Sequence, residues 1–414
     1  MGERLIVELA DMAHGGDAVG RYEGKAIFVP YGIPGESVRV EIVRDRGRFA
    51  HARLLDVLST SPQRVQPPCP YFGACGGCQW QHMAYETQLE HKRSIVRAQL
   101  ERIATLPDVT VHPTLGMTDP WRYRNHVQFS VSRGGKLGFM ATSSRKVVPI
   151  ERCLLMHSLL EGVFDSLDIE LPDLQRLSLR AGINTGEQMI IFEMASDQPP
   201  ELEVDLPVSC VLLLSDGTPV TLVGSPYIHE SVAGRVYRLS APSFFQVNTH
   251  QTEKLVSLVS TYLSPEPDSV VLDAYCGVGT FGLGLAEKAK QVIGIESNAA
   301  AIADATANAT DMDNVIFVHG PVEEIIPTLD VTAPLVIIDP PRTGLDKKAL
   351  SALVNLAPVR IVYVSCDPAT LARDVKRLLA SGYHLREVQP IDMFPQTYHI
   401  ECVAVLTSFP EEPG

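Results

Sequence analysis

The sequence lacks any hydrophobic run long enough to cross a membrane. Its first residues, MGERLIVELADMAHGG, lack the basic segment followed by a long apolar one that marks a secretory signal. We therefore expect a cytoplasmic protein with no membrane partner. Internal repeats and low-complexity segments are missing as well. The 414 residues, of which 45% are hydrophobic, suffice for two or three domains with buried cores.

An excess of positive charge is also missing, since the formal net charge is −14. This balance argues against diffuse nucleic-acid binding, which requires neutralisation of phosphates. The basic residues are gathered in two islands instead. Residues 121–152 carry seven Arg and Lys against one glutamate, with aromatic residues interleaved, and residues 39–53 carry five Arg against two acidic residues. The islands indicate a defined track for a polyanion, and solvated charged hairpins are the alternative.

The order of strand and helix patterns predicts three parts. Residues 1–61 read as five short strands separated by glycine-rich turns, which favours a small β-barrel of the OB type. Residues 62–240 begin with a proline-rich boundary and a cysteine cluster, continue with a helix over about 83–104, and then alternate as a mostly antiparallel β domain. Residues 241–414 alternate buried strands with helices, which predicts a parallel, doubly wound sheet closed by an antiparallel pair.

A cofactor pocket is expected beyond the carboxyl ends of the parallel strands. Asp273 and Tyr275 lie on the first of these strands and its glycine-rich turn, and Glu296 ends the second strand, where an acid accepts hydrogen bonds from ribose hydroxyls. The turn reads GVGTFG, and because a glycine loop alone is weak evidence, a dinucleotide enzyme is the competitor. Asp339-Pro340-Pro341-Arg342 after the fourth strand favours an S-adenosylmethionine-dependent transferase over that competitor.

Cys366 follows the fifth strand and precedes a helix that Asp367 can cap, with Pro368 at the first helical position. A thiol at a helix N-terminus, on the side of the sheet where ligands bind, is a candidate nucleophile. Thiolate addition to carbon 6 of a pyrimidine makes carbon 5 nucleophilic enough to accept a methyl group. Glu401, in the apolar strand YHIECVAV, is the leading base for the carbon 5 proton, and a surface-facing glutamate is the alternative.

Eight cysteines in a chain expected to be cytosolic do not indicate a disulfide framework, and three of them cluster. Cys69, Cys75 and Cys78 lie in one glycine-rich segment, and Cys153 is the best distant fourth ligand. Four thiolates suit an iron–sulfur cluster or zinc, and their spacing does not choose between them. Radical chemistry is disfavoured because the C-x3-C-x2-C triad is missing.

Taken together, the motifs resemble the RNA uracil-5 methyltransferases, in particular the iron–sulfur branch that acts on 23S ribosomal RNA. The resemblance is carried by GDAVGRYEGKAIFVPYGIPGE, the cysteine segment, SFFQVN, LDAYCGVGTF, IGIE, DPPRTG, VSCDPATLARD and DMFPQTYHIECVAVL, and it spans nearly the whole chain. It implies a TRAM domain at the N-terminus, a Rossmann-like methyltransferase domain at the C-terminus, and a 4Fe-4S cluster bound by Cys69, Cys75, Cys78 and Cys153. It further implies Cys366 as nucleophile, Glu401 as base, and Gln246, Tyr275, Glu296 and Asp339 as contacts to S-adenosylmethionine.

The chain departs from the family pattern in HGPVEE after the third strand, because relatives often have a polar residue where this chain has Pro321. Contacts to the adenine near Gly320 and Pro321 must therefore come from the backbone or from a neighbouring residue. We expect an RNA partner that donates a flipped uridine, and a monomeric protein. Trp121, Tyr123, Arg122 and Arg124 are candidate RNA contacts, with a core role as the alternative. The rivals are a transfer RNA uridine-54 methyltransferase, an RNA cytosine-5 methyltransferase, and a non-catalytic RNA-binding assembly factor.

Overall fold

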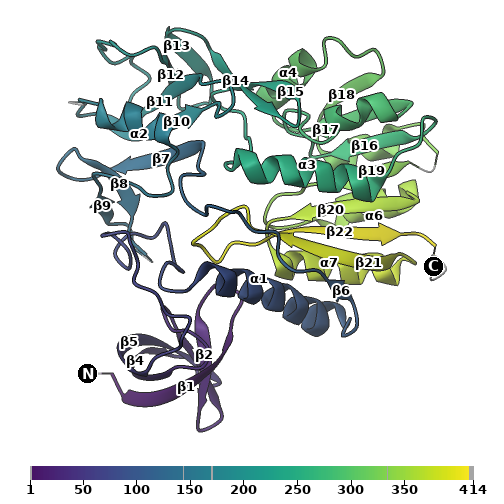
Figure 1. Cartoon of the computed structure of the whole chain (residues 1–414). Coiled ribbons are helices and arrows are strands. Elements are labelled where there is room, and N and C mark those ends of the chain that lie inside the picture. Colours follow the sequence, from purple (N-terminus) through teal and green to yellow (C-terminus); the bar gives the residue numbers. More distant parts are fainter. Residues whose placement is uncertain (1, 143, 169–170, 333, 410–414) are drawn as a thin grey trace.

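The first part of the chain is a closed five-stranded barrel, as the sequence predicts. The computed structural model describes residues 2–142, 144–168, 171–332 and 334–409. The barrel strands follow the order β1-β2-β3-β5-β4 and form the purple unit in Figure 1. Buried and exposed residues alternate along β1, which fills the interior with aliphatic side chains. The strands are β1 (Arg4–Met12), β2 (Ala18–Tyr22), β3 (Lys25–Val29), β4 (Ser37–Asp45) and β5 (Phe49–Ser59).

The central part is built on a seven-stranded sheet in the order β13-β12-β11-β10-β7-β8-β9. Neighbouring strands are antiparallel except β11 and β12, which run parallel. Helix α2 (Ser158–Asp165) packs on the sheet and completes a core that contains Phe129, Leu160 and Leu177. The strands are β7 (His126–Val131), β8 (Leu137–Met140), β9 (Val147–Pro149), β10 (Leu174–Ala181), β11 (Gln188–Met194), β12 (Ser209–Leu213) and β13 (Pro219–Val223).

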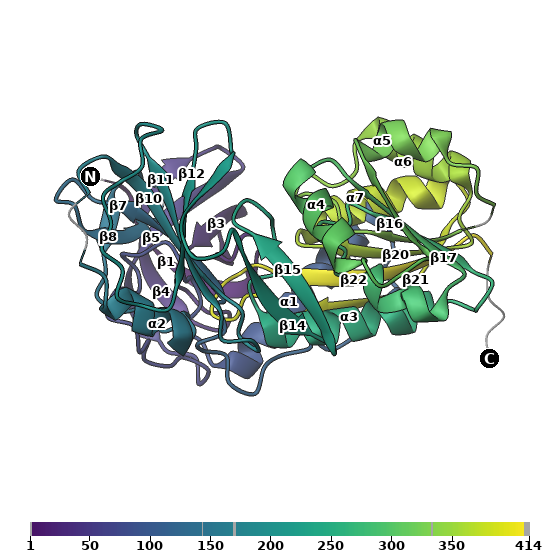
Figure 2. The same ribbon diagram turned by 90° about the horizontal axis from the view of Figure 1, so that it is seen from above.

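The C-terminal part contains an eight-stranded sheet in the order β18-β17-β16-β19-β20-β22-β21-β6. Strands β16 to β20 are parallel, and β22 is antiparallel to both neighbours. This is the predicted doubly wound arrangement, and its strands lie in the green-to-yellow part on the right of Figure 2. The strands are β16 (Val270–Ala274), β17 (Gln291–Glu296), β18 (Val315–His319), β19 (Leu335–Ile338), β20 (Arg360–Ser365), β21 (His384–Ile391) and β22 (Glu401–Thr407).

Helices cover the sheet, and one of them is a 3₁₀ helix. It comprises residues 283–288 (Leu283–Lys288), within TFGLGLAEKA, a segment that the sequence predicts as a helix. Gly282 and Gly284 account for the 3₁₀ form, since glycine is a poor helix former. The other helices are α3 (Thr249–Leu263), α4 (Ala299–Asn308), α5 (Val322–Ile325), a 3₁₀ turn (Ile326–Thr328), α6 (Lys347–Leu356) and α7 (Pro368–Ala380).

Several segments join the parts of the chain. The predicted helix over 83–104 is α1 (Tyr85–Gln99), continued by a π-helical turn (Leu100–Ala104), and it packs against α7. Strand β6 (Thr110–Val111) extends the C-terminal sheet by pairing with β21. The hairpin of β14 (Tyr227–Val232) and β15 (Arg235–Ser240) lies against α3 and α4 (Figure 1). The division of the chain at residues 61 and 240 stays a prediction.

Within the part of the chain that the structure describes, no helix has the length and apolar character needed to cross a bilayer.

Candidate active site

Cys366 stands at the turn between β20 and α7. Asp367 caps the helix, as its side-chain Oδ1 accepts hydrogen bonds from the backbone N–H of Ala369 at 3.0 Å and of Thr370 at 2.8 Å. Pro368 occupies the first helical position. The turn is therefore fixed by local hydrogen bonds, and Cys366 is only partly buried at the carboxyl end of its strand.

Glu401 lies near this cysteine, at the start of the strand next to β20. Strands β20 and β22 are antiparallel, and their register pairs Ser365 with Cys402. Cys366 directly follows this pair on one strand and Glu401 directly precedes it on the other, and the Glu401 carboxylate contributes to raising the pKa of the Cys366 thiol. The Glu401 side chain is buried, and burial followed by the nearby Asp339 carboxylate raises its pKa well above the ordinary value, although Arg342 opposes the shift. A carboxyl group of this kind is suited to proton transfer.

The thiol of Cys366 faces a small cavity of about 220 Å³. Burial raises its pKa to about 12, the Glu401 and Asp339 carboxylates add to this effect, and Arg342 counteracts it. Burial and the two carboxylates thus oppose the thiolate form that a helix N-terminus favours. The cavity is lined by His14, Gly15, Arg342, Cys366, Asp367, Pro368, Tyr398, His399 and Ile400.

Tyr275, Glu296 and Asp339, three of the four predicted cofactor residues, lie at neighbouring strand ends of one sheet. Glu296 accepts hydrogen bonds from the backbone N–H of Gly277 at 3.1 Å and of Asn298 at 2.7 Å, which ties the end of β17 to the glycine-rich turn. Tyr275 begins that turn with a φ of 65°. Burial raises the pKa of Asp339, after β19, to about 7, with further contributions from Asp273 and Glu296.

Asp273 was noted in the sequence only as a strand residue, yet it stands out in the structure. Its Oδ2 accepts a hydrogen bond from Gly282 N at 2.8 Å, while its buried Oδ1 has no partner among the described residues. Burial raises its pKa to about 7.

Gln246, the fourth predicted cofactor residue, is buried, and its backbone carbonyl oxygen accepts a hydrogen bond from the side chain of Asn125 at 3.0 Å. The backbone N–H of Gly320 donates to Glu296 O at 3.0 Å.

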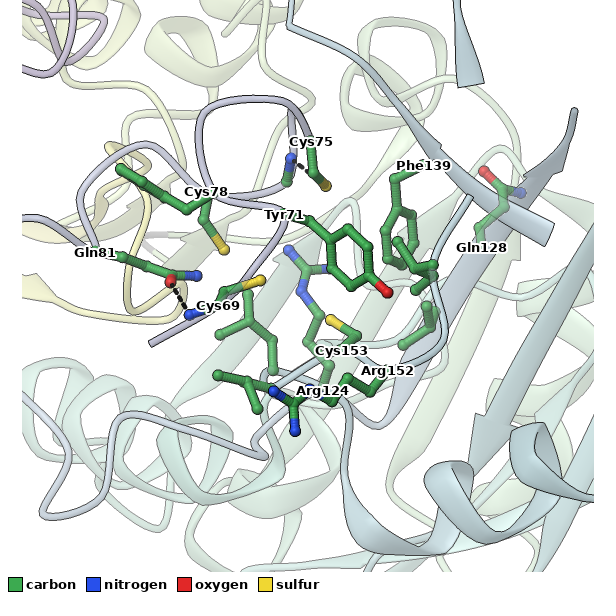
Figure 3. A pocket seen from close by; sticks show the side chains of 16 residues that line it. Cys69, Tyr71, Cys75, Cys78, Gln81, Arg124, Gln128, Phe139, Arg152 and Cys153 are labelled. Atoms are coloured by element: carbon green, nitrogen blue, oxygen red, sulfur yellow. Dashed lines mark hydrogen bonds between the residues drawn. The ribbon is translucent and has the colours of Figure 1, made fainter. Parts of the chain in front are cut away.

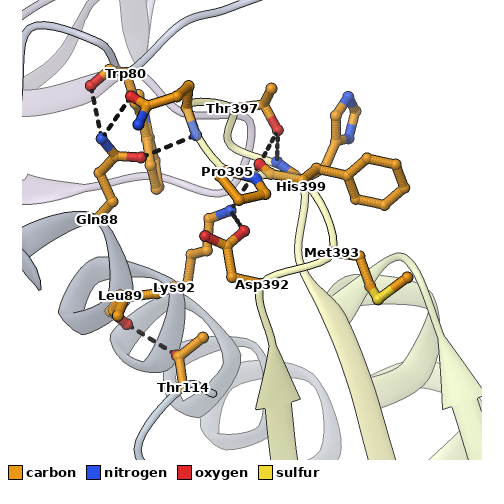
Figure 4. Close-up of polar contacts among 12 residues, drawn as sticks. Trp80, Gln88, Leu89, Lys92, Thr114, Asp392, Met393, Pro395, Thr397 and His399 are labelled. Carbon is orange, nitrogen blue, oxygen red and sulfur yellow. Dashed lines mark hydrogen bonds and ion pairs between the residues drawn. The ribbon is translucent and has the colours of Figure 1, made fainter. Parts of the chain in front are cut away.

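The segment 392–400, which leads into Glu401, is held from outside its own sheet. Nζ of Lys92 on α1 lies 2.5 Å from Asp392 Oδ1, and both side chains are fully buried. The Tyr85 hydroxyl donates to the other Asp392 oxygen at 2.8 Å, and Gln88 Nε2 donates to the side-chain oxygen of Gln396 at 3.0 Å. Figure 4 shows Gln88 and Lys92 reaching from α1 toward the loop, with Lys92 paired with Asp392.

Sequence reasoning missed Lys92, although a signal was present. Lys92 lies three residues after Leu89 and three before Ile95, on the apolar stripe of the helix. A lysine in such a stripe needs a buried partner. The stripe could have identified Lys92 as a paired residue. It could not have identified the partner, Asp392, because that residue lies 300 positions away in the sequence.

The four predicted metal-ligating cysteines line a second cavity of about 220 Å³. Their sulfur atoms gather around it in Figure 3, with Tyr71 and Arg124 close by. Burial raises the pKa of Cys75, Cys78 and Cys153, to about 12 for Cys78, and neighbouring thiols of the set add to each shift. Among the described residues, however, no group of three or more His, Cys, Asp or Glu side chains is arranged to hold one metal ion.

The aromatic RNA contacts suggested by the sequence divide into two cases. Tyr123 is buried, and its hydroxyl donates to the carbonyl oxygen of Pro395 at 3.1 Å. It is a core residue that supports the loop before Glu401, so the stacking hypothesis is wrong for it. Trp121 is half-buried, and Arg122 is exposed. The guanidinium of Arg124 lies 5.8 Å from the ring of Tyr123.

Comparison with known proteins adds evidence independent of this geometry. The family model for tRNA (uracil-5-)-methyltransferases matches residues 222–409, and the TRAM domain model matches residues 2–55. An uncharacterised RNA methyltransferase of Halalkalibacterium halodurans is 37% identical over 97% of this chain and 96% of its own length. A similar protein of Thermosynechococcus vestitus is 35% identical over 98% of both chains.

A solved structure shares the whole architecture. The tRNA (uracil-54, C5)-methyltransferase of Pyrococcus abyssi, in complex with S-adenosyl-L-homocysteine, is 29% identical and has a TM-score of 0.77, covering 98% of this chain and 100% of the other. The barrel is thus a TRAM domain, the C-terminal sheet is a methyltransferase fold, and the methyl donor is S-adenosylmethionine. On these grounds, the chain belongs to the RNA uracil-5 methyltransferase family.

Proposed function

We propose that this protein methylates carbon 5 of one uridine in a structured RNA through a covalent intermediate with Cys366. The observation that carries the proposal is the nearness of Cys366 and Glu401, which flank the last pair, Ser365 with Cys402, of the β20–β22 ladder. The Asp339 carboxylate is close enough to raise the pKa of both groups. A nucleophile and a base separated by one strand spacing can act on neighbouring atoms of a single pyrimidine ring.

The two residues divide the reaction between them. The Cys366 sulfur adds to carbon 6, and the electron pair of the ring double bond makes carbon 5 nucleophilic. S-adenosylmethionine supplies an electrophilic methyl group on a sulfonium. Glu401 then accepts the carbon 5 proton, the double bond re-forms, and the Cys366 thiolate leaves carbon 6. The raised pKa of Glu401 suits it to hold that proton.

The donor set fits the methyl donor. Glu296 presents a carboxylate at the end of β17 for ribose hydroxyls, and the glycine turn after β16 allows close approach to the backbone. Tyr275 and Gln246 flank this region in the motifs of the family. The acidic side chains Asp273 and Asp339 favour a ligand that carries positive charge.

An RNA strand has a route to Cys366. A groove of about 1240 Å³ runs between the barrel, the cysteine segment and the central sheet, and it shares Gly15 and Tyr398 with the catalytic cavity. The groove is lined by Arg44 and Arg53, from the basic island at residues 39–53, and by Arg176 from β10. Positive side chains along one groove are the expected track for phosphates.

We further propose 23S ribosomal RNA as the substrate, on the resemblance of the sequence motifs. Transfer RNA is the second candidate, because the solved structure with the same architecture is a tRNA (uracil-54, C5)-methyltransferase. Cys69, Cys75, Cys78 and Cys153 are proposed to hold a 4Fe-4S cluster. The four thiols line one cavity, and four thiolates suit an iron–sulfur cluster as well as zinc, so the choice of the cluster rests on the resemblance of the sequence motifs.

Mass spectrometry of nucleosides tests the proposal. Total RNA from cells that lack this protein would be incubated with the purified protein and isotopically labelled S-adenosylmethionine, separated by size, and digested. We expect labelled 5-methyluridine in the large ribosomal RNA fraction. Label in the transfer RNA fraction would support the second candidate, and label in 5-methylcytidine, or full activity of Cys366→Ala, would overturn the mechanism.

A further inference from the structure

A loop of the N-terminal barrel enters the catalytic cavity. Residues 13–17 connect β1 to β2, and His14 and Gly15 line the same cavity as Cys366. The loop is a tight turn, in which Gly16 N donates to Ala13 O at 3.0 Å and Ala13 N donates to Asp17 O at 2.9 Å. The cavity is therefore not built by the methyltransferase fold alone.

Two contacts hold this loop against the catalytic side. The indole N–H of Trp80, next to the cysteine segment, donates to Gly16 O at 3.0 Å, and Trp80 is fully buried. Gly16 packs on Tyr398, since a Cβ added at Gly16 would lie 2.6 Å from the Tyr398 Cβ. Its φ of +89° also favours glycine. The approach of the loop thus depends on a residue without a side chain.

His14 completes the hydrogen bonding of the carboxylate next to the nucleophile. Asp367 uses Oδ1 to cap α7, and its Oδ2 lies 3.3 Å from Nε2 of His14. Burial alone would raise the pKa of Asp367, but the bonds from His14 and from the helix N–H groups hold it at about 2. The carboxylate is thus fixed from both sides, by its own helix and by the barrel.

We propose that His14 is a positioning residue for methyl transfer, which holds the Cys366–Asp367 turn in the geometry that lets the sulfur reach carbon 6. This inference rests on the proposed function. It gives the TRAM domain a part in the chemical step as well as in RNA binding. An imidazole N–H serves this purpose in either charge state, because Asp367 needs only a donor at that place.

The test compares kcat with KM for His14→Ala and His14→Gln, using the RNA fraction that the wild-type protein methylates. We expect His14→Ala to lower kcat about tenfold while KM for the RNA changes less than about twofold, since the lost bond acts on the reacting turn and not on RNA affinity. The glutamine amide can reach the position of Nε2, and His14→Gln should restore most of the rate. His229→Ala is the matched control, because His229 also pairs with a carboxylate, Glu187, and its side chain is 37% exposed like that of His14.

A second variant separates the loop from the cavity without removing His14. Gly16→Ala should push the loop from Tyr398 and reproduce the loss in kcat. Gly24→Ala, in the next turn of the same barrel, adds a methyl group at a φ of +80° with no atom within 4 Å and controls for backbone strain.

Three results would overturn the inference: a wild-type kcat for His14→Ala, a change confined to KM, or no rescue by glutamine. Cys366→Ala assayed alongside separates the two claims. If it is inactive while His14→Ala is fully active, only the role of His14 is wrong; if it is active, the proposed function itself is wrong.

Discussion

Replacing Lys92 with methionine removes one half of the buried ion pair that holds segment 392–400. Both side chains are shielded from solvent, and Nζ lies 2.5 Å from the Asp392 oxygen. Burial lowers the pKa of Lys92, although the facing Asp392 carboxylate opposes this shift. The cost of taking both charges out of water consumes most of their attraction, so the intact pair contributes little more than two apolar side chains would.

Breaking the pair is far more costly than its net contribution suggests. The Asp392 carboxylate stays buried, and among the residues that the structure describes only the Tyr85 hydroxyl, at 2.8 Å, is left as its side-chain donor. We expect Lys92→Met to lower the free energy of unfolding by about 3–5 kcal/mol. For a domain of the size of the C-terminal part, this corresponds to a fall in Tm of about 6–20 °C. Calorimetry measures the shift, and hydrogen exchange of the β21 and β22 amides locates it.

A double variant distinguishes a buried charge from lost packing. Lys92→Met combined with Asp392→Asn removes both charges and keeps an acceptor for Tyr85, so it should recover at least half of the lost stability. Arg39→Met is the control, since its pair with Asp56 is exposed and is expected to contribute less than about 1 kcal/mol. A loss below about 1 kcal/mol for Lys92→Met, or a double variant less stable than the single one, would refute the reasoning.

Three further predictions concern the chemistry. Glu401→Gln should slow turnover by about 10²–10⁴-fold and let a covalent RNA–protein adduct accumulate on denaturing gels; a variant that turns over normally would exclude Glu401 as the base. Because the pKa of Cys366 is raised to about 12 and Arg342 counteracts that shift, adduct formation should rise with pH, and Arg342→Ala should be slower at neutral pH and gain more from raising it; identical pH profiles would contradict this role. Anaerobically purified protein should contain iron and inorganic sulfide, and Cys153→Ser should lose both, whereas zinc without sulfide would reject the cluster.

The sequence predicted those parts of the fold that leave a local pattern. Alternation along the first sixty residues indicated the barrel, and buried apolar runs separated by helices indicated the doubly wound sheet. The capping of α7 by Asp367 followed from residue types alone. The segment TFGLGLAEKA was predicted as a helix without its type, and the structure forms a 3₁₀ helix there, at Leu283–Lys288.

The candidate site was predictable residue by residue but not as an assembly. Strand-end positions identified Cys366, Glu296 and Asp339, because parallel strands bring their carboxyl ends to one edge of the sheet. Periodicity assigns a side chain to a face of an element, yet it carries no information about which distant segment covers that face. For this reason the sequence could indicate that Lys92 is buried, but it could not identify Asp392 as its partner. It likewise could not decide whether Tyr123 contacts RNA or lies in the core.

The contacts that the sequence could not foresee reach two segments beside the candidate site, the turn after β20 and the segment 392–400. The barrel reaches Asp367 through His14, α1 reaches Asp392 through Lys92, and the cysteine segment reaches Gln396, whose carbonyl oxygen accepts from the backbone N–H of Trp80 at 3.0 Å. The proposed RNA groove is lined by the same barrel and cysteine segments. RNA bound in the groove would contact the elements that shape the catalytic cavity. Only interactions that improve the reacting geometry accelerate the chemical step. The substrate RNA should therefore differ from other RNAs in kcat as well as in binding affinity.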